Sequence, residues 1–236
     1  MHKKMPIMEI FGPTIQGEGI AIGQKTMFVR TGGCDYSCSW CDSAFTWNGE
    51  EKARMMTAPD VWEGLKELAG GNFQHVTISG GNPALIGAPM YELVYLLKRN
   101  GMTVALETQG SRWQNWFEMI DQLTISPKPP SSGMKTNYKT LDDIIERLEL
   151  AKNVTLKVVI FDDADYAYAK NLHKNYPLIP MFLSVGNPDV KGDVSEFKLL
   201  RLYGELVDRI MWDPEMRNVR VLPQLHVLLW GNKRGV

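Results

Sequence analysis

The stretch from residue 25 to residue 43 reads KTMFVRTGGCDYSCSWCDS. Its first part, Lys25–Thr31, is rich in apolar and β-forming side chains, which predicts a strand. Two glycines, Gly32 and Gly33, then predict a turn. All cysteines of the chain follow within eight residues: Cys34, Cys38 and Cys41. Because an odd number of cysteines at this spacing fits no disulfide framework, the group points to a metal site.

The rest of the chain alternates between β-rich runs and helical patterns. Further strands are predicted at His75–Ser79, Thr103–Glu107, Gln122–Ser126, Val154–Ile160, Met181–Val185 and Val219–Leu222. Helices are predicted at Ala58–Ala69, Pro89–Arg99, Trp113–Met119, Leu141–Leu150, Ala164–Asn175 and Val194–Ile210. Strands that alternate with helices indicate an α/β fold with parallel pairing and right-handed crossovers. About six such units fit, which favours a partial or full parallel barrel over an open doubly wound sheet.

Loops that carry polar residues and glycines follow several of these strands. They cover residues 32–41, 79–83, 107–110, 126–130 and 184–188. In both architectures, ligands bind at the carboxyl ends of the parallel strands. We therefore expect a single site that gathers these loops.

The composition limits the classes of function. The chain has 236 residues, of which 44% are hydrophobic, and a formal net charge of −1. These values predict one globular domain over residues 1–236 and disfavour broad binding to nucleic acid or anionic membranes. No run reaches the roughly eighteen apolar residues of a membrane span, and the N-terminal MHKKMPIMEIFG lacks the apolar part of a secretory signal. We expect a soluble protein of the cytoplasm.

The spacing Cys-x3-Cys-x2-Cys, with the aromatic Trp40 before the last cysteine, resembles the signature of the radical S-adenosylmethionine superfamily. The resemblance implies a partial parallel barrel of the radical SAM kind and a 4Fe–4S cluster on Cys34, Cys38 and Cys41. One iron would remain open to the amino and carboxylate groups of S-adenosylmethionine, with Trp40 near the adenine. A structural zinc site is the alternative, with a histidine distant in sequence as the fourth ligand.

Two other groups of residues are assigned to the cofactor by the same resemblance. The run Ser79–Pro83 (SGGNP) is similar to a Gly-Gly-Glu-Pro element that holds the methionine end of the cofactor, here through Gly81 and Asn82. Asn82 takes the place of the usual acid, and the pattern alone predicts no more than a turn. Residues assigned to the ribose, carboxylate or adenine of the cofactor are Ser126, Pro127, Lys128, Ser184 and Asn187.

Three stretches that together span most of the chain resemble the 7-carboxy-7-deazaguanine synthase family. They are residues 12–19 (GPTIQGEG), 28–34 (FVRTGGC) and 222–236 (LPQLHVLLWGNKRGV). Alone, the first predicts a glycine-rich turn before the first strand, without the spacing of a phosphate-binding loop. The resemblance implies the substrate 6-carboxy-5,6,7,8-tetrahydropterin. A 5′-deoxyadenosyl radical would take hydrogen from C6, and ring contraction with loss of ammonia would give 7-carboxy-7-deazaguanine, a 7-deazapurine (queuosine) precursor.

This family resemblance also implies which residues bind the substrate and Mg²⁺. The residues at the pterin edge would be Ile15, Gln16, Gly17, Glu18 and Ser79. Arg30 would bind the substrate carboxylate with its planar guanidinium, although an arginine at a strand end is also compatible with simple solvent exposure. Ser43 would bind Mg²⁺, and Asp42 beside it would orient the hydroxyl within the cofactor site.

The remaining partners are implied by the resemblance alone. They are a second copy of the chain, in a homodimer, and a reducing partner such as flavodoxin or ferredoxin. A rival function is a radical activating enzyme that installs a glycyl radical on a protein partner, but the segment around Glu18 and Arg30 favours a small anionic substrate. Near the C-terminus, Gln224 and His226 either line the substrate pocket or pack against the last strand.

Overall fold

The strands of the described residues, 2–148, 153–190, 192 and 195–236, form one sheet in this computed structural model. The strands are β1 (Met5–Ile15), β2 (Lys25–Thr31), β3 (Arg54–Met56), β4 (His75–Gly80), β5 (Thr103–Thr108), β6 (Gln122–Ile125), β7 (Val154–Ile160), β8 (Met181–Val185) and β9 (Val219–Leu222). Their order in the sheet is β3-β1-β2-β4-β5-β6-β7-β8-β9. Strand β1 pairs antiparallel with β2 and β3, and the other pairs are parallel. No pairing among the described residues joins β9 to β3, so the barrel is partial, as the sequence predicts.

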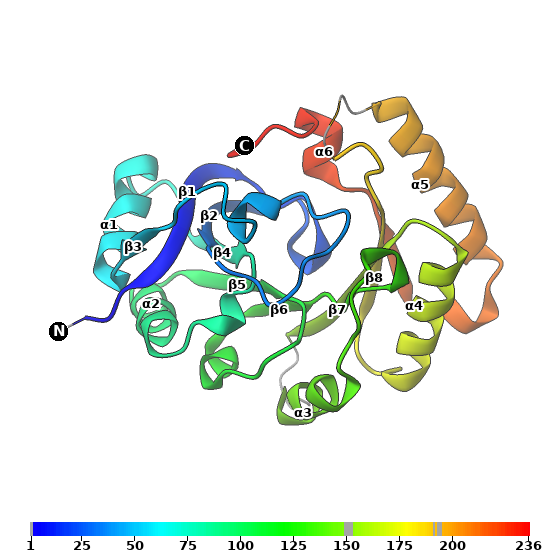
Figure 1. Cartoon of the computed structure of the whole chain (residues 1–236), viewed down its shortest axis with the longest axis horizontal. Coiled ribbons are helices and arrows are strands. Elements are labelled where there is room, and N and C mark those ends of the chain that lie inside the picture. The colour runs from blue at the N-terminus through cyan, green and yellow to red at the C-terminus, as the bar shows by residue number, and fades with distance from the viewer. Residues whose placement is uncertain (1, 149–152, 191, 193–194) are drawn as a thin grey trace.

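The longer helices surround the strands on their outer side (Figure 1). They are α1 (Ala58–Ala69), α2 (Ala88–Arg99), α3 (Tyr138–Leu148), α4 (Asp163–Asn175) and α5 (Glu196–Met211), and a short helix, α6 (Leu225–Trp230), follows β9. Figure 1 shows α1 and α2 at one end of the sheet and α4 and α5 at the other. No helix among the described residues combines the length and the apolar character needed to cross a membrane.

The predicted strands are confirmed within one residue at each end. The helix Ala58–Ala69 is also confirmed, together with its predicted cap and stop. The predicted ends at Leu150 and Val194 lie outside the described residues, and the helices at those places are α3 and α5. The predicted helix Trp113–Met119 is a shorter 3₁₀ helix, Asn115–Met119.

Two predictions about the N-terminal segment are wrong. Residues 12–15 belong to β1 and not to a turn, so Lys25–Thr31 is the second strand and not the first. The sequence hides β1 because Pro6 and Pro13 lie within it, and proline is normally confined to strand edges and bulges. In the structure, the pairing of β1 with β2 shifts register between Phe11 and Thr14, on either side of Gly12 and Pro13.

Helix α1 shows how the local sequence fixes the ends of an element. The Thr57 hydroxyl accepts a hydrogen bond from the Asp60 amide at 3.3 Å, and the Asp60 carboxylate accepts from the Thr57 amide at 2.8 Å. This reciprocal pair satisfies two amides that the first helical turn leaves without partners. At the other end, Gly70 has a φ of 55°, which is a left-handed conformation that favours glycine.

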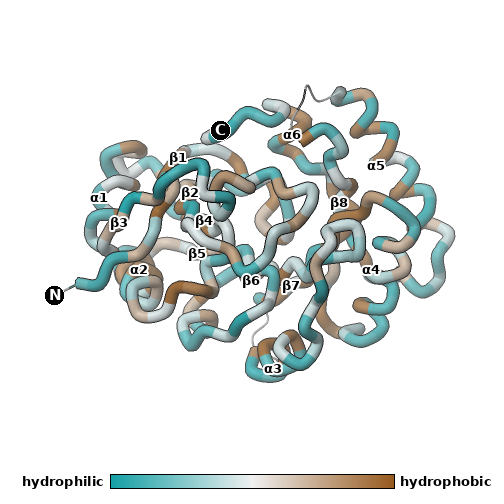
Figure 2. Tube along the Cα trace, in the orientation of Figure 1, coloured by the Kyte–Doolittle hydropathy of each residue, from teal (hydrophilic) through white to brown (hydrophobic). Residues whose placement is uncertain are grey.

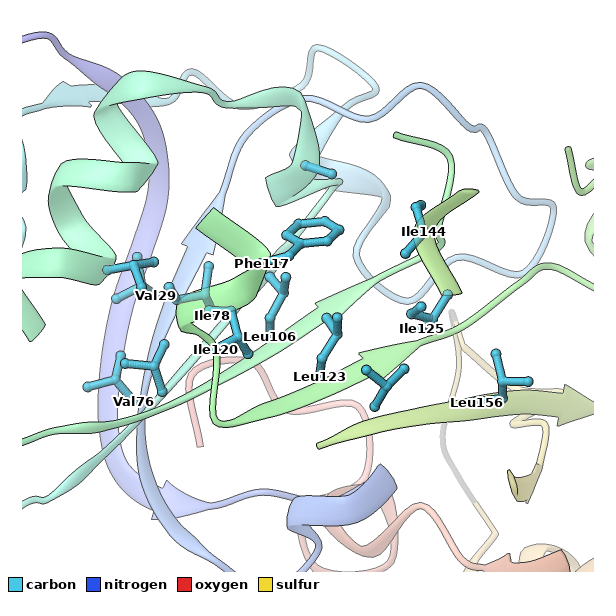
Figure 3. Packing of buried hydrophobic residues seen from close by; sticks show 14 of the residues in the cluster. Val29, Val76, Ile78, Leu106, Phe117, Ile120, Leu123, Ile125, Ile144 and Leu156 are labelled. Carbon is cyan, nitrogen blue, oxygen red and sulfur yellow. The ribbon is translucent and has the colours of Figure 1, made fainter. Parts of the chain in front are cut away.

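Alternation along the parallel strands divides the side chains between two environments. Val29, Ile78, Leu106 and Leu156 face the helices and are fully buried, and Figure 3 shows them in one continuous layer. Figure 2 shows that apolar segments occur in the strands and in the helices around them. The intervening side chains point to the opposite face, inside the partial barrel. Those near the carboxyl ends of the strands are Arg30, Ser79, Glu107 and Lys157.

Candidate active site

A cavity of about 440 Å³ lies at the carboxyl ends of the parallel strands. The expected ligand-binding residues that line it are Ile15, Gln16, Gly17, Glu18, Arg30, Cys34, Cys38, Trp40, Cys41, Asp42, Ser43, Ser79, Gly81, Ser126, Lys128 and Asn187. Three expected residues, Asn82, Pro127 and Ser184, are buried outside the lining. The structure therefore brings most of the predicted site to one place, including segments from both ends of the chain.

The cysteine loop presents three free thiols to this cavity. Two polar groups donate to the Cys34 sulfur: the Tyr36 amide at 3.4 Å and the Gln109 side chain at 3.6 Å. The indole N–H of Trp47 donates to the Cys41 sulfur at 3.4 Å. Donors directed at sulfur favour its thiolate form, which is the form that binds iron.

Burial in the protein disfavours the ionised form of these thiols. Burial raises the pKa of all three cysteines, and it raises the pKa of Cys38 to about 11 although Lys128 opposes the shift. A bound metal would supply the missing positive charge. No group of three His, Cys, Asp or Glu side chains among the described residues surrounds a position for a single ion. Three cysteine thiolates are soft ligands of the kind that hold an iron–sulfur cluster.

Trp40 lies between the cysteines and the strand ends. Its indole N–H donates to the Ser131 hydroxyl at 2.9 Å. Its ring centroid lies 5.1 Å from that of Phe161, and the ammonium of Lys128 lies 5.7 Å from the Trp40 ring. Lys128 also donates to the Ser126 hydroxyl at 3.4 Å, so the residues expected at the adenine and ribose lie together.

The glycine-rich loop after β4 packs tightly against the cysteine loop. The Asn82 amide donates to the Gly33 carbonyl at 2.8 Å. A Cβ atom on Gly81 would overlap the Gly33 backbone and approach Cys34 Cβ to 3.1 Å. Only glycine permits this approach, so Gly81 sets the position of the first cysteine.

The Asn82 side chain has protein partners for both of its polar atoms. Its Nδ2 donates to Asp35 and to Ser111, each at 2.9 Å. Its Oδ1 accepts from the Thr108 hydroxyl at 2.8 Å and from the Ala84 amide at 3.2 Å. Asn82 therefore ties the cysteine loop to the loops after β4 and β5.

A group of charged side chains fills the opposite side of the cavity. Lys157 Nζ lies 2.7 Å from Glu18 Oε2 and 3.9 Å from Glu107 Oε1. Burial opposes the ionisation of Glu18, but the positive charge of Lys157, together with the hydrogen bonds from Lys157 and Gln224, outweighs it and lowers the pKa of Glu18 to about 2. Burial also acts against the charge of Lys157, but Glu18 and Glu107 raise its pKa above the ordinary value. The group thus holds a fixed anion at Glu18 and a fixed cation at Lys157.

The segment around Glu18 is fixed by the C-terminal part of the chain. Gln224 donates to Glu18 Oε1 at 2.9 Å, and the Leu225 amide donates to the Gly17 carbonyl at 3.0 Å. A Cβ atom on Gly17 would lie 2.8 Å from the His226 ring carbon Cγ. Gln224 and His226 both line the cavity.

Arg30 lies in an aromatic and acidic setting at the end of β2. Its Nη1 lies 2.7 Å from Glu9 Oε1, and Arg234 binds the same carboxylate at 2.8 Å. The guanidinium carbon of Arg30 lies 5.2 Å from the Phe11 ring centroid and 5.5 Å from that of Phe45. The Arg30 Nε is buried and has no hydrogen-bond partner among the described residues. A planar guanidinium that lines a cavity suits a carboxylate ligand.

Ser43 and Asp42 form a small oxygen-rich corner of the cavity. The Ser43 hydroxyl donates to Asp42 Oδ1 at 3.0 Å. Hydroxyl and carboxylate oxygens are hard donors of the kind that Mg²⁺ accepts, usually together with water and substrate oxygens. The two residues thus fit an ion that is completed by the substrate.

The cavity lining also includes polar and charged residues that the sequence did not identify as site residues, among them Glu107, Gln109, Lys157 and Arg234. The pairing of Arg30 with Ser79 shows the available signal, because neighbouring positions in adjacent strands share a face. In the next strand, Glu107 accepts a hydrogen bond from the Ser79 hydroxyl at 3.3 Å. Glu107 and Lys157 are charged residues within apolar strands, at positions that alternate toward the inside of the barrel. This pattern could have identified them from the sequence.

Comparison with known proteins assigns the family. Residues 28–163, more than half of the chain, match the family model of the radical SAM superfamily. The chain is 57% identical to 7-carboxy-7-deazaguanine synthase of Bacillus cereus over 238 residues, which cover 99% of both chains. It is also 57% identical to 7-carboxy-7-deazaguanine synthase of Bacillus subtilis over 244 residues, which cover 100% of both. The fold is similar to QueE from Escherichia coli, with a TM-score of 0.67 and 22% identity over 94% of this chain and 95% of that one. This chain belongs to the 7-carboxy-7-deazaguanine synthase family of the radical SAM superfamily.

Proposed function

We propose that the protein is the lyase that converts 6-carboxy-5,6,7,8-tetrahydropterin to 7-carboxy-7-deazaguanine and ammonia. One observation carries the proposal: a single cavity has three cysteines on one side and Arg30 with the buried Glu18–Lys157 pair on the other. When bound, the reduced 4Fe–4S cluster and S-adenosylmethionine supply a radical that abstracts hydrogen. The neighbouring residues of this chain then have to hold the pterin within reach of that radical.

On the cluster side, the proposed ligands of iron are Cys34, Cys38 and Cys41. The residues proposed to contact S-adenosylmethionine are Trp40, Gly81, Ser126, Lys128 and Asn187, all of which line the cavity. Asn82 supports this site through its contacts with Asp35 and Ser111. Pro127 and Ser184, also proposed for the cofactor, are buried outside the lining. Neither a glycyl-radical activating enzyme nor a zinc module finds support among the full-length relatives.

On the other side, the proposed pterin site has a fixed charge pattern. The pterin ring carries adjacent N–H donors, and the ionised Glu18 is an acceptor for them. The backbone of Ile15, Gln16 and Gly17 lines the same wall, and Ser79 lies beside Glu107. Gln224 and Lys157 already hold Glu18 in place. The Glu18 side chain therefore loses little conformational entropy when the substrate binds.

Arg30 is proposed to bind the substrate carboxylate, and its replacement tests the substrate assignment. Arg30→Ala should raise KM for the carboxypterin by on the order of tenfold to a hundredfold with a smaller change in kcat, because a charge-assisted contact is lost. Arg147→Ala is the matched control, since Arg147 pairs with Asp143 on the exposed face of α3. An unchanged KM in Arg30→Ala would show that the substrate carboxylate binds elsewhere.

Mg²⁺ is proposed to bind at Ser43, with Asp42 as its neighbour, and to bridge to the substrate. A reducing partner such as flavodoxin or ferredoxin is proposed because the cluster must be reduced before each cleavage. A cytoplasmic location is proposed because a reducing compartment keeps the three cysteines free for iron.

A homodimer is proposed through the outer face of α5. Apolar side chains are exposed along this helix: Phe197 (81%), Leu200 (52%), Met211 (67%) and Trp212 (88%), the last directly after it. These side chains lie near the two ends of the helix, and large exposed apolar side chains of this kind are common in interaction surfaces, which two copies can cover symmetrically. Sedimentation should show a dimer for the native protein and a monomer for the double variant Phe197→Ser, Trp212→Ser. If both proteins sediment as dimers, this surface is not the dimer interface.

A further inference from the structure

A buried carboxylate outside the cavity controls the surroundings of Trp40. Asp165 lies in the first turn of α4 and is fully buried. Its Oδ1 accepts from the Ser131 amide at 3.0 Å, and its Oδ2 accepts from the Ser131 hydroxyl at 2.6 Å. Oδ2 also accepts from the Phe161 amide at 3.0 Å. The Asp165 carboxylate thus fixes Ser131, which binds the Trp40 indole, and Phe161, which packs against the Trp40 ring.

Ser131 passes this restraint to the cysteine loop. Its hydroxyl donates to Asp165 and accepts the indole N–H of Trp40 at 2.9 Å. Its carbonyl accepts from the Ser39 hydroxyl at 2.8 Å. Because a hydroxyl that donates to a carboxylate becomes a better acceptor, the bond to Trp40 is strengthened by Asp165.

The ring of Trp40 is also restrained at its face. The Phe161 ring lies 5.1 Å away at an interplanar angle of 36°. Gly186, directly after β8, leaves the space that the Phe161 ring occupies, because a Cβ atom there would overlap the ring. Edge and face of the indole are therefore both set by groups that do not themselves depend on a ligand.

We propose that Asp165, acting through Ser131, is a positioning residue that fixes the Trp40 ring for contact with the adenine of S-adenosylmethionine. The inference rests on the proposed function, because it requires Trp40 at the adenine. Stacking requires a defined ring plane, and a ring that is already fixed loses less conformational freedom on binding. Without the Ser131 hydroxyl, the indole N–H loses its acceptor and the ring can rotate within the cavity.

The test is a double-mutant cycle on anaerobically reconstituted protein, with affinity for S-adenosylhomocysteine measured by calorimetry. Ser131→Ala should weaken binding by roughly threefold to tenfold, the range expected for one lost hydrogen bond. In the Trp40→Phe background, which has no indole N–H, Ser131→Ala should have no further effect. Ser131→Thr should restore the native affinity because it retains the hydroxyl. Iron and sulfide contents should be unchanged in all variants.

A second readout follows the ring without any ligand. In protein labelled with 5-fluorotryptophan, the Trp40 resonance is the one lost in Trp40→Phe, and Ser131→Ala and Asp165→Asn should both shift it. The proposal is wrong if Ser131→Ala weakens binding equally in both backgrounds or leaves affinity and resonance unchanged. If Trp40→Phe and Trp40→Leu both bind S-adenosylhomocysteine with native affinity, the adenine does not lie at Trp40. That result would count against the proposed function and not only against the role of Asp165.

Discussion

Lys157 is the residue on which the charge pattern of the cavity depends most. It lies between two carboxylates in the wall of the cavity, 2.7 Å from Glu18 and 3.9 Å from Glu107. The pair is buried, so neither charge is well solvated when its partner is missing. The ionised Glu18, which is proposed to bind the N–H groups of the pterin, is stabilised in this buried position by the ammonium group of Lys157.

Replacing Lys157 should therefore cost more stability than removing the whole pair. Lys157→Met should lower the free energy of unfolding by about 3–5 kcal/mol at pH 7, because Glu18 is left as an uncompensated buried charge. The double variant Lys157→Met, Glu18→Gln should recover much of that loss. Urea unfolding of the cluster-free proteins measures both. A double variant that is no more stable than the single one would contradict the assignment of the charge on Glu18.

The same pair predicts a pH dependence of stability. The pKa of Glu18 falls from its ordinary value of 4.5 in the unfolded chain to about 2 in the folded protein. Its ionised form therefore stabilises the fold fully above pH 4.5, and this contribution is lost as the pH falls towards 2. The stability of Glu18→Gln should lack this component of the acid dependence, and identical acid dependence in both proteins would contradict the lowered pKa.

Ser43 tests the proposed Mg²⁺ position. Ser43→Ala should raise the Mg²⁺ concentration needed for half-maximal turnover, because one oxygen ligand is lost and its neighbour Asp42 loses the hydroxyl that it binds. Ser43→Thr is the control, since it retains a hydroxyl at the same place. Titration of turnover with Mg²⁺ measures the effect, and superimposable curves for Ser43→Ala and the native protein would reject this ligand.

Among the elements, the loop after β4 determines where the cysteine loop lies. Gly81 has no room for a side chain beside Gly33 and Cys34. Gly81→Ala should displace the first cysteine and lower the iron and sulfide that reconstitution retains to well below half. Thr57→Ala is the matched control, because it costs about 1 kcal/mol through the cap of α1 far from the cavity. Native iron content in Gly81→Ala would show that the loops can separate without affecting the cluster.

The elements also show what the sequence could and could not predict. The cap at Thr57 and the stop at Gly70 depend on neighbouring residues, and both were predicted correctly. Strand β1 depends on pairing with β2 and β3 across bulges, and its prolines conceal it from local patterns.

At the scale of the molecule, some residues of the candidate site could be predicted from the sequence and others could not. The cysteines and the segment around Glu18 are contiguous motifs, so the sequence indicates them directly. Glu107 and Lys157 are single charges in separate strands, and they meet only because β5, β6 and β7 are neighbours in the sheet. The C-terminal Arg234 reaches Glu9 and Glu51 only through the course of the whole chain.

The central claim is that the three cysteines and the charged wall act on one substrate within one cavity. The most direct measurement uses carboxypterin carrying deuterium at C6, with reconstituted protein, reductant, S-adenosylmethionine and Mg²⁺, and Cys38→Ala as the inactive control. Because the conversion with loss of ammonia is redox-neutral, the abstracted hydrogen has to return after the rearrangement. Mass spectrometry should therefore show 7-carboxy-7-deazaguanine, with deuterium from C6 in the re-formed S-adenosylmethionine and in any 5′-deoxyadenosine that is released. Unlabelled 5′-deoxyadenosine without a deazaguanine product, from protein that carries its full iron and sulfide, would contradict the account.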